Sequence, residues 1–354
     1  MNDNQTTITL PNSTYCGLYK PRVSWLVGNS SAFHIILGIL TVVASFPTAL
    51  LNAFIILAIK QRRELQKATN ILLSSLAVTD LLVGVISMPT TATIDFFILR
   101  RVSFENTCML GLVNLFFIPL LFAATLHHLT IIAWERYVAV QKWRDYKRII
   151  TNGRLKKIAI GTWLSALFPT IACFSLRVFL VDRKIFNIVF VWWTAVESVC
   201  LFLVAFLYLK VYLGIRYRKL NEISQIHVLM KAKLESKVAK TTGLLTAALI
   251  SSFIPICLFA ILGNVVPLLH TNAAIRFTQL VTQLNSLFNP LLYCYREQRF
   301  RNAIRELLGI KKGKAIQAEV GAPKRFLRNN SIRPWELHKG GKLTNALEDQ
   351  HLAI

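Results

Sequence analysis

The chain has 354 residues, of which 54% are hydrophobic, and it carries a formal net charge of +24 at pH 7. Its mean hydropathy of +0.49 is too high for an ordinary soluble domain, and its length suits a compact helical membrane protein. The positive charge does not indicate nucleic-acid binding, because the basic residues lie in short segments between long apolar runs.

The chain begins with a polar segment, residues 1–32, that is expected to be an extracellular tail. It lacks the basic and then apolar pattern of a signal peptide. Three Asn-x-Ser/Thr sequons in this tail begin at Asn4, Asn12 and Asn29, which are candidate glycosylation sites.

Seven long apolar runs follow, and each is predicted to cross a membrane as a helix. Lipid offers backbone polar groups no partner, so a long apolar run must satisfy them within its own helix. The runs therefore predict an all-α membrane protein with a seven-helix bundle over residues 33–296. They cover residues 33–59, 70–99, 106–140, 157–176, 185–214, 241–263 and 277–295.

The loops between these runs predict the orientation of the bundle. Loops after the first, third and fifth runs carry more Lys and Arg than the loops on the opposite side. Since basic loops stay in the cytoplasm, the amino terminus is predicted to lie outside the cell and the carboxyl terminus inside.

The segment after the seventh run has two parts. Residues 297–309 are predicted to form an amphipathic helix on the inner leaflet, because Phe300, Ile304, Leu307 and Leu308 share one face. Residues 310–354 are basic and polar, and we expect a disordered cytoplasmic tail.

Six cysteines are scattered along the chain without a C-x-x-C pair, which argues against a metal or redox framework. Cys108 has two candidate disulfide partners, Cys16 and Cys173. The sequence leaves both pairings open.

Charged residues at the inner end of the third run stand out. No Asp, Glu, Lys or Arg occurs over residues 109–134, and Glu135, Arg136 and Tyr137 then follow directly. Neighbouring opposite charges can hold each other at the water boundary, where a charge costs far less than at mid-bilayer. Glu135 and Arg136 therefore have two interpretations. They are either side chains that snorkel to water at a helix end or a pair with a function.

Nearly every run carries a marker residue or motif. These markers are Asn52, Leu76-Ala77-Val78-Thr79-Asp80, Glu135-Arg136-Tyr137, Trp163, Pro255, Asn285-Ser286-Leu287-Phe288-Asn289-Pro290-Leu291-Leu292-Tyr293 and Phe300. Their joint order and spacing resemble those of the rhodopsin-like (class A) G-protein-coupled receptors over about residues 35–308. The resemblance implies a plasma-membrane receptor that couples an extracellular ligand to a heterotrimeric G protein. It also implies an arrestin and a receptor kinase as partners, with membrane lipid around the bundle.

By this resemblance, Arg136 is the centre of the switch. It is expected to be held by Glu135 and by an acid at the inner end of the sixth helix, for which Glu235 is the candidate. The alternative for Glu235 is a solvated charge in a Lys-rich helix. The remaining switch residues are Tyr137, Tyr208, Asn289, Pro290 and Tyr293, with Pro290 removing a backbone donor and so loosening the seventh helix.

Asp80 is a carboxylate at mid-membrane, which must be protonated, paired or bound to a cation. The resemblance implies an allosteric sodium ion here, and no other cofactor. The alternative is a neutral Asp in a water-filled polar network. The implied sodium ligands are Asp80, Thr125, Asn285, Ser286 and Asn289.

The ligand class does not follow from the sequence. Ile118 stands where amine receptors carry an Asp, and the seventh run has no lysine for retinal, so both classes are disfavoured. Glu197 is expected either to pair a cationic ligand or to bond another helix or His127 and His128. The predicted pocket residues are Asp95, Asn114, Phe117, Ile118, Trp193, Glu197, Phe259, Gln279 and Gln283.

Two departures from the family pattern concern the route from ligand to switch. Phe253 replaces the usual Trp of the sixth helix, and Cys200 replaces the usual proline of the fifth. A rival function is a small ion-coupled transporter or channel that uses Asp80 and Glu197, although the chain shows no internal repeat. No nucleophile-base constellation appears, so an enzyme is not predicted.

Overall fold

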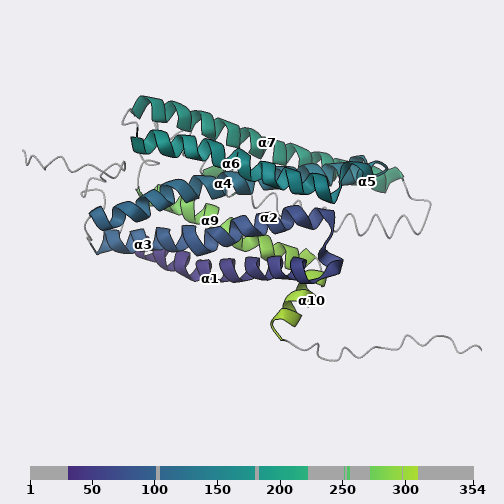
Figure 1. Ribbon diagram of the computed structural model, residues 1–354, viewed down its shortest axis with the longest axis horizontal. Helices are drawn as coiled ribbons and strands as arrows, with labels where there is room; N and C mark the ends of the chain where they lie inside the picture. Colours follow the sequence, from purple (N-terminus) through teal and green to yellow (C-terminus); the bar gives the residue numbers. More distant parts are fainter. Residues whose placement is uncertain are drawn as a thin grey trace, which may run out of the picture. The chain divides into compact units, whose positions relative to one another are not determined.

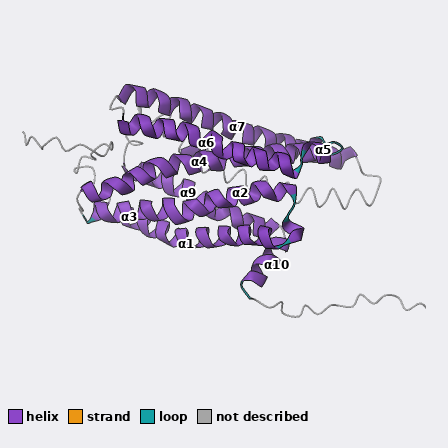
Figure 2. Cartoon of the chain, in the orientation of Figure 1, coloured by secondary structure: helices purple, strands orange, loops and turns teal. Residues whose placement is uncertain are grey.

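The computed structural model describes residues 31–100, 104–179, 183–221, 251, 253–255, 272–296 and 298–309. These residues belong to one compact unit, Met1–Lys311. Within them every regular element is a helix (Figures 1 and 2). The elements are α1 Ser31–Gln61, a 3-10 turn Arg63–Leu65, α2 Ala68–Leu82, a π-helical turn Val83–Ser87, α3 Met88–Leu99, α4 Phe104–Gln141, α5 Tyr146–Ile149, α6 Asn152–Phe179, α7 Arg183–Asn221, α9 Asn272–Arg296 and α10 Gln298–Leu307.

The first five predicted runs and the seventh coincide with helices of the structure. Five segments of the described chain are long and apolar enough to cross a membrane: Ala32–Gln61, Ala68–Phe97, Cys108–Gln141, Asn152–Leu176 and Val191–Tyr217. The seventh run lies within α9. Most of the sixth run, 241–263, lies outside the described residues, although 253–255 are helical. The prediction of an all-helical membrane fold is therefore confirmed for the described part of the chain.

The second predicted helix contains a π-helical turn, Val83–Ser87, between α2 and α3. Pro89 explains its position, because this residue has no N–H and its ring would clash with the carbonyl of Val85 in a regular α-helix. Gly84 lets α1 approach this turn closely: a Cβ there would lie 2.7 Å from the backbone nitrogen of Ala49. The turn separates Asp80 on α2 from Asp95 on α3 and sets the direction of α3.

Helix α4 lies at the centre of the packing. It contacts α2, α6 and α7, while α1 contacts α2, α3 and α9 (Figure 1). The largest buried cluster joins Leu76, Phe122 and Phe253 to Tyr293. Large apolar side chains also cover the outer faces, and Phe46 on α1 is 72% exposed and Phe202 on α7 is 69% exposed. Such faces suit lipid rather than water.

Helix α10 is amphipathic, as predicted. Phe300, Ala303 and Ile304 are buried, and α10 contacts α1 and α9. Leu308, which was predicted on the same face, is half exposed because the helix ends at Leu307. Its position on the inner leaflet stays a prediction.

Candidate functional site

The carboxyl-terminal end of α4, which the sequence predicts to be its inner end, carries a buried charge pair. Arg136 Nε lies 3.2 Å from Glu135 Oε2, and Glu135 is almost completely buried. The other oxygen of this carboxylate, Oε1, accepts a hydrogen bond of 2.5 Å from the hydroxyl of Tyr146. Two elements, α4 and α5, therefore hold the two oxygens of one carboxylate.

Tyr146 is a site residue that the sequence did not indicate. Four residues, 142–145, connect α4 to α5, and the path of this connection brings the phenol back to Glu135. Burial and then the negative charge of Glu135 raise the pKa of the Tyr146 phenol above its ordinary value. The hydroxyl consequently remains a hydrogen-bond donor at physiological pH.

The other predicted switch residues lie around one apolar cluster. Tyr293 is buried in it, and Tyr137 and Tyr208 are partly buried against it. Asn289 and Pro290 are buried in α9. Glu235 lies outside the described residues, so the contact of Arg136 with an acid of the sixth helix stays a prediction.

A polar core lies between α2 and α9. Asp80 is fully buried, and its Oδ2 accepts a hydrogen bond of 2.8 Å from Asn289 Nδ2. Its Oδ1 has no hydrogen-bond partner in the described part of the chain. Thr125 and Ser286 are buried and line one cavity of about 40 Å³. Buried Asn285 completes the predicted set. The unsatisfied oxygen of this buried carboxylate has the chemistry of a ligand for a small hard cation. Sodium at this position stays a prediction.

Asn52 joins the first helix to this core. Its Nδ2 donates to the carbonyl of Thr48 at 2.9 Å and to the carbonyl of Ser286 at 3.0 Å. The second bond links α1 to α9.

A cavity of about 440 Å³ lies at the opposite end of the bundle from Arg136. We call this the outer end, after the predicted orientation, and the cavity the outer pocket. Four of the predicted pocket residues line it: Asn114, Ile118, Trp193 and Gln279. Most of its lining side chains are apolar, as is usual for a small-molecule pocket.

Other predicted pocket residues lie elsewhere. Gln283 lines the smaller cavity, where its Nε2 donates to Ser87 Oγ at 3.0 Å. Phe117 packs against a buried cluster of Ala44 on α1, Val83, Met88 on α3 and Leu121 on α4. Glu197 turns to His127 on α4. These two side chains do not line the outer pocket. Phe259 lies outside the described residues.

Asp95 contributes through Arg276, a pocket residue that directly precedes the seventh apolar run. Arg276 Nε donates to Asp95 Oδ1 at 2.8 Å, and its Nη2 donates to Oδ2. Arg276 Nη1 also donates to Gln279 Oε1 at 2.5 Å. Helix α9 begins at Asn272, so Arg276 lies within the helix and beside the outer pocket. In the sequence, an acidic residue within an apolar run, Asp95, was the signal that a basic partner lies nearby.

An aromatic trio connects the two cavities. The ring centroid of Phe122 lies 5.6 Å from that of Trp193 and 4.8 Å from that of Phe253. Phe122 lines both the outer pocket and the smaller cavity. Phe253, which replaces the usual Trp, is thus in direct contact with the wall of the outer pocket.

The neighbouring residues His127 and His128 lie in two different environments. His128 Nδ1 lies 2.7 Å from the carbonyl of Ala124, and its Nε2 lies 2.7 Å from Ser75 Oγ and 3.1 Å from Thr162 Oγ1. These bonds connect α2, α4 and α6. His127 Nε2 instead lies 3.4 Å from Glu197 Oε1 on α7.

The cysteines settle one of the two disulfide alternatives. Cys108 is disulfide-bonded, whereas Cys173 is a free thiol. The predicted pairing of Cys108 with Cys173 is therefore wrong, because Cys173, on α6, is not part of a disulfide. Cys16 and the sequons at Asn4, Asn12 and Asn29 lie outside the described residues.

The chain is similar to known receptors. The model of the family "7 transmembrane receptor (rhodopsin family)" matches residues 51–293. Cannabinoid receptor 1 of Xenopus laevis is 24% identical over 301 residues, a match that covers 76% of this chain and 62% of that receptor. The 5-hydroxytryptamine receptor 1D of Canis lupus familiaris is 25% identical over 364 residues, with 82% and 92% covered. The chain thus spans less than two thirds of that cannabinoid receptor.

Proposed function

Because the chain belongs to the rhodopsin family of seven-transmembrane receptors, we propose that it converts binding of an extracellular ligand into activation of a heterotrimeric G protein. The plasma membrane is its proposed location, with the amino terminus outside. An arrestin and a receptor kinase are proposed as further partners. The similarity to receptors gives no support to the alternative of a transporter or channel that uses Asp80 and Glu197.

The observation that carries this proposal is the pairing of Arg136 with a carboxylate that Tyr146 also holds. We call the arrangement in which Arg136 is paired with Glu135 the closed state. Separation of the pair frees Arg136 and opens a cleft into which a G protein docks. A ligand that binds the open state more tightly shifts the equilibrium toward it.

The outer pocket supports a route for this shift. A ligand there contacts Phe122, whose ring touches Phe253. Phe253 also lines the small cavity with Ser286, which lies about one helical turn from Asn289, the hydrogen-bond partner of Asp80. Sodium bound at Asp80 would favour the closed state, since it occupies the polar core that α9 must rearrange.

The proposed ligand is largely apolar with a hydrogen-bonding group. The outer pocket offers Asn114 and Gln279 as polar contacts, and Ile118 is part of its wall. Asp95, which could have paired an ammonium group, is already engaged by Arg276. The pocket therefore fits a cannabinoid, the ligand in the name of one relative, better than 5-hydroxytryptamine, the ligand in the name of the other, which carries an amine.

The test is nucleotide exchange on a panel of purified G proteins with receptor in membranes. Arg136→Ala should abolish exchange, and Glu135→Gln should raise its basal rate. The exposed Arg148, whose substitution leaves this pair intact, provides the control Arg148→Ala. Glu235→Ala should also raise basal exchange if Glu235 holds Arg136. Parent-like exchange by Arg136→Ala at matched surface expression would contradict the proposal.

A further inference from the structure

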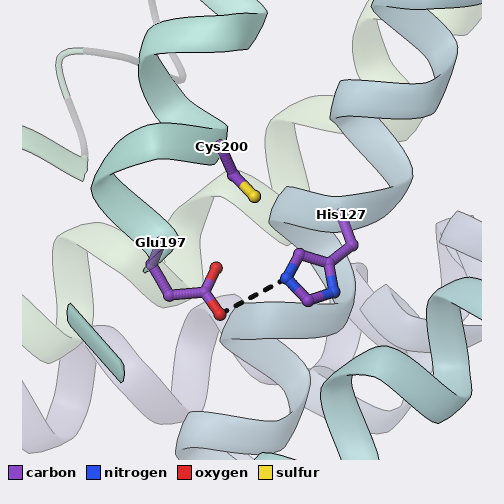
Figure 3. A group of neighbouring side chains, drawn as sticks. All are labelled: His127, Glu197 and Cys200. Carbon is purple, nitrogen blue, oxygen red and sulfur yellow. Dashed lines mark ion pairs between the residues drawn. The ribbon is translucent and has the colours of Figure 1, made fainter. Parts of the chain in front are cut away.

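Three side chains with metal-binding atoms meet between α4 and α7, apart from the switch and the outer pocket. They are His127, Glu197 and Cys200, and their ligand atoms lie within 4.8 Å of one another. Glu197 and Cys200 are three residues apart on α7, so both lie on the same face of that helix. Figure 3 shows the imidazole of His127 directed from α4 toward the Glu197 carboxylate, with the Cys200 sulfur beside them.

Glu197 is incompletely satisfied in this position. Its exposed fraction is 4%, and its Oε2 has no hydrogen-bond partner among the described residues. His127 is its ion-pair partner in the same part of the chain, with Nε2 3.4 Å from Oε1. A carboxylate buried within a membrane span must meet positive charge or a proton.

The hydrogen bonds of Ser165 fix which nitrogen of His127 carries the proton. Ser165 Oγ donates its hydrogen to the carbonyl of Thr162 at 2.9 Å. His127 Nδ1 lies 2.9 Å from the same Oγ, which has only lone pairs left to offer, so Nδ1 must be the donor. In neutral His127 the Nε2 lone pair then faces the Glu197 carboxylate. Two acceptors in this arrangement repel unless a proton or a metal ion lies between them.

We propose that His127, Glu197 and Cys200 bind a zinc ion that links α4 to α7. Imidazole, carboxylate and thiolate are the three ligand types of protein zinc sites, and three protein ligands leave a fourth position open. With bonds of about 2.1 Å in a tetrahedral site, a nitrogen and an oxygen ligand are about 3.4 Å apart. The observed separation of His127 Nε2 and Glu197 Oε1 is 3.4 Å.

The charges of the cluster also favour zinc. A neutral imidazole, one carboxylate and one thiolate balance a divalent cation, so the complex has no net charge in the apolar interior. Binding releases the thiol proton of Cys200 to solvent. The thiolate and imidazole select a softer transition metal over sodium, magnesium or calcium, which prefer oxygen. The hydrogen bond from His127 Nδ1 to Ser165 keeps the ring oriented. Metal-bound histidines usually donate their other ring N–H to a neighbouring acceptor in the same way.

The test uses purified full-length receptor in detergent, stripped with a chelator and titrated with zinc alone and with cobalt(II) as a spectroscopic substitute. We expect one zinc per receptor, a thiolate-to-cobalt charge-transfer band, and a melting temperature that rises by roughly 5 °C at saturating zinc. None of these readings requires a G protein, so they are independent of the proposed function.

Four variants distinguish this site from adventitious binding. Cys200→Ser should remove the charge-transfer band, and both Cys200→Ser and Glu197→Gln should weaken zinc binding more than roughly tenfold. Ser165→Ala should weaken it by about tenfold through the loss of ring orientation. Cys173→Ser removes a free thiol on α6 and should bind zinc like the parent.

Parent receptor without saturable zinc binding would overturn the proposal. So would Cys200→Ser and Glu197→Gln variants that bind zinc as the parent does, since His127 and Glu197 would then form a proton-bridged pair. The melting temperature without metal shows whether each variant is folded. If Cys200→Ser does not fold, Glu197→Gln together with the cobalt spectrum decides.

Discussion

Replacing Tyr146 by Phe should raise the basal activity of the receptor. The change removes one hydroxyl, whose 2.5 Å bond to Glu135 Oε1 it abolishes, and keeps the ring that packs against the core. A hydrogen bond to a charged group contributes about 1.5 to 3 kcal/mol, and the lower value applies because Tyr146 is only partly buried. In the closed state the lost bond leaves a buried carboxylate oxygen without a donor. In the open state water replaces the hydroxyl.

The closed state therefore loses about 1.5 kcal/mol relative to the open state, which raises the open-to-closed ratio about tenfold. The assay is ligand-free nucleotide exchange on a G protein at matched surface expression. Tyr217→Phe is the control, because Tyr217 on α7 is 68% exposed. A Tyr146→Phe rate equal to that of the parent and of Tyr217→Phe would refute the role of this bond.

The pH dependence of this effect follows from the raised pKa of Tyr146. A raised pKa means that the stabilisation by the protonated phenol is fully present below its ordinary pKa of about 10 and is lost only as pH rises through the raised value. The ratio of basal rates between Tyr146→Phe and the parent should thus be constant between about pH 6 and 9. A ratio that falls toward one over this interval would show that the phenol ionises there.

Three further changes test the outer half and the core. A double-mutant cycle of Asp95→Ala and Arg276→Ala, followed by thermal unfolding, should give a coupling energy of about 2 kcal/mol, and independent effects would argue against the pair. Phe122→Ala merges the two cavities and should lower stability by about 3 kcal/mol and uncouple ligand binding from nucleotide exchange; intact coupling would remove Phe122 from the route. Asp80→Asn should give equal basal exchange in sodium and choline chloride, whereas the parent should be slower in sodium, and a parent insensitive to sodium would contradict the cation site.

The sequence by itself determined the helices and indicated the residues of the proposed switch. Lipid requires long apolar stretches to be helical, so both ends of α1 and α4 follow within a few residues from hydropathy alone, whereas α6 begins before its apolar run and α7 continues beyond its own. Glu135 and Arg136 were recognisable for a similar reason, because charges stop an apolar run abruptly. Asn114, Ile118, Trp193 and Gln279 lay at the right level along their helices and do line the outer pocket.

Only the tertiary structure decided which side chains face one another. Hydropathy fixes the level of a residue along a helix, but partners depend on the rotation of each helix about its axis and on the path of the connections. The turn after α4 brings Tyr146 to Glu135, the early start of α9 brings Arg276 to Asp95, and the packing of α4 on α7 turns Glu197 to His127 instead of the pocket. Each contact joins segments whose spacing in the sequence carries no record of that rotation, because it is set by how the apolar faces fit together.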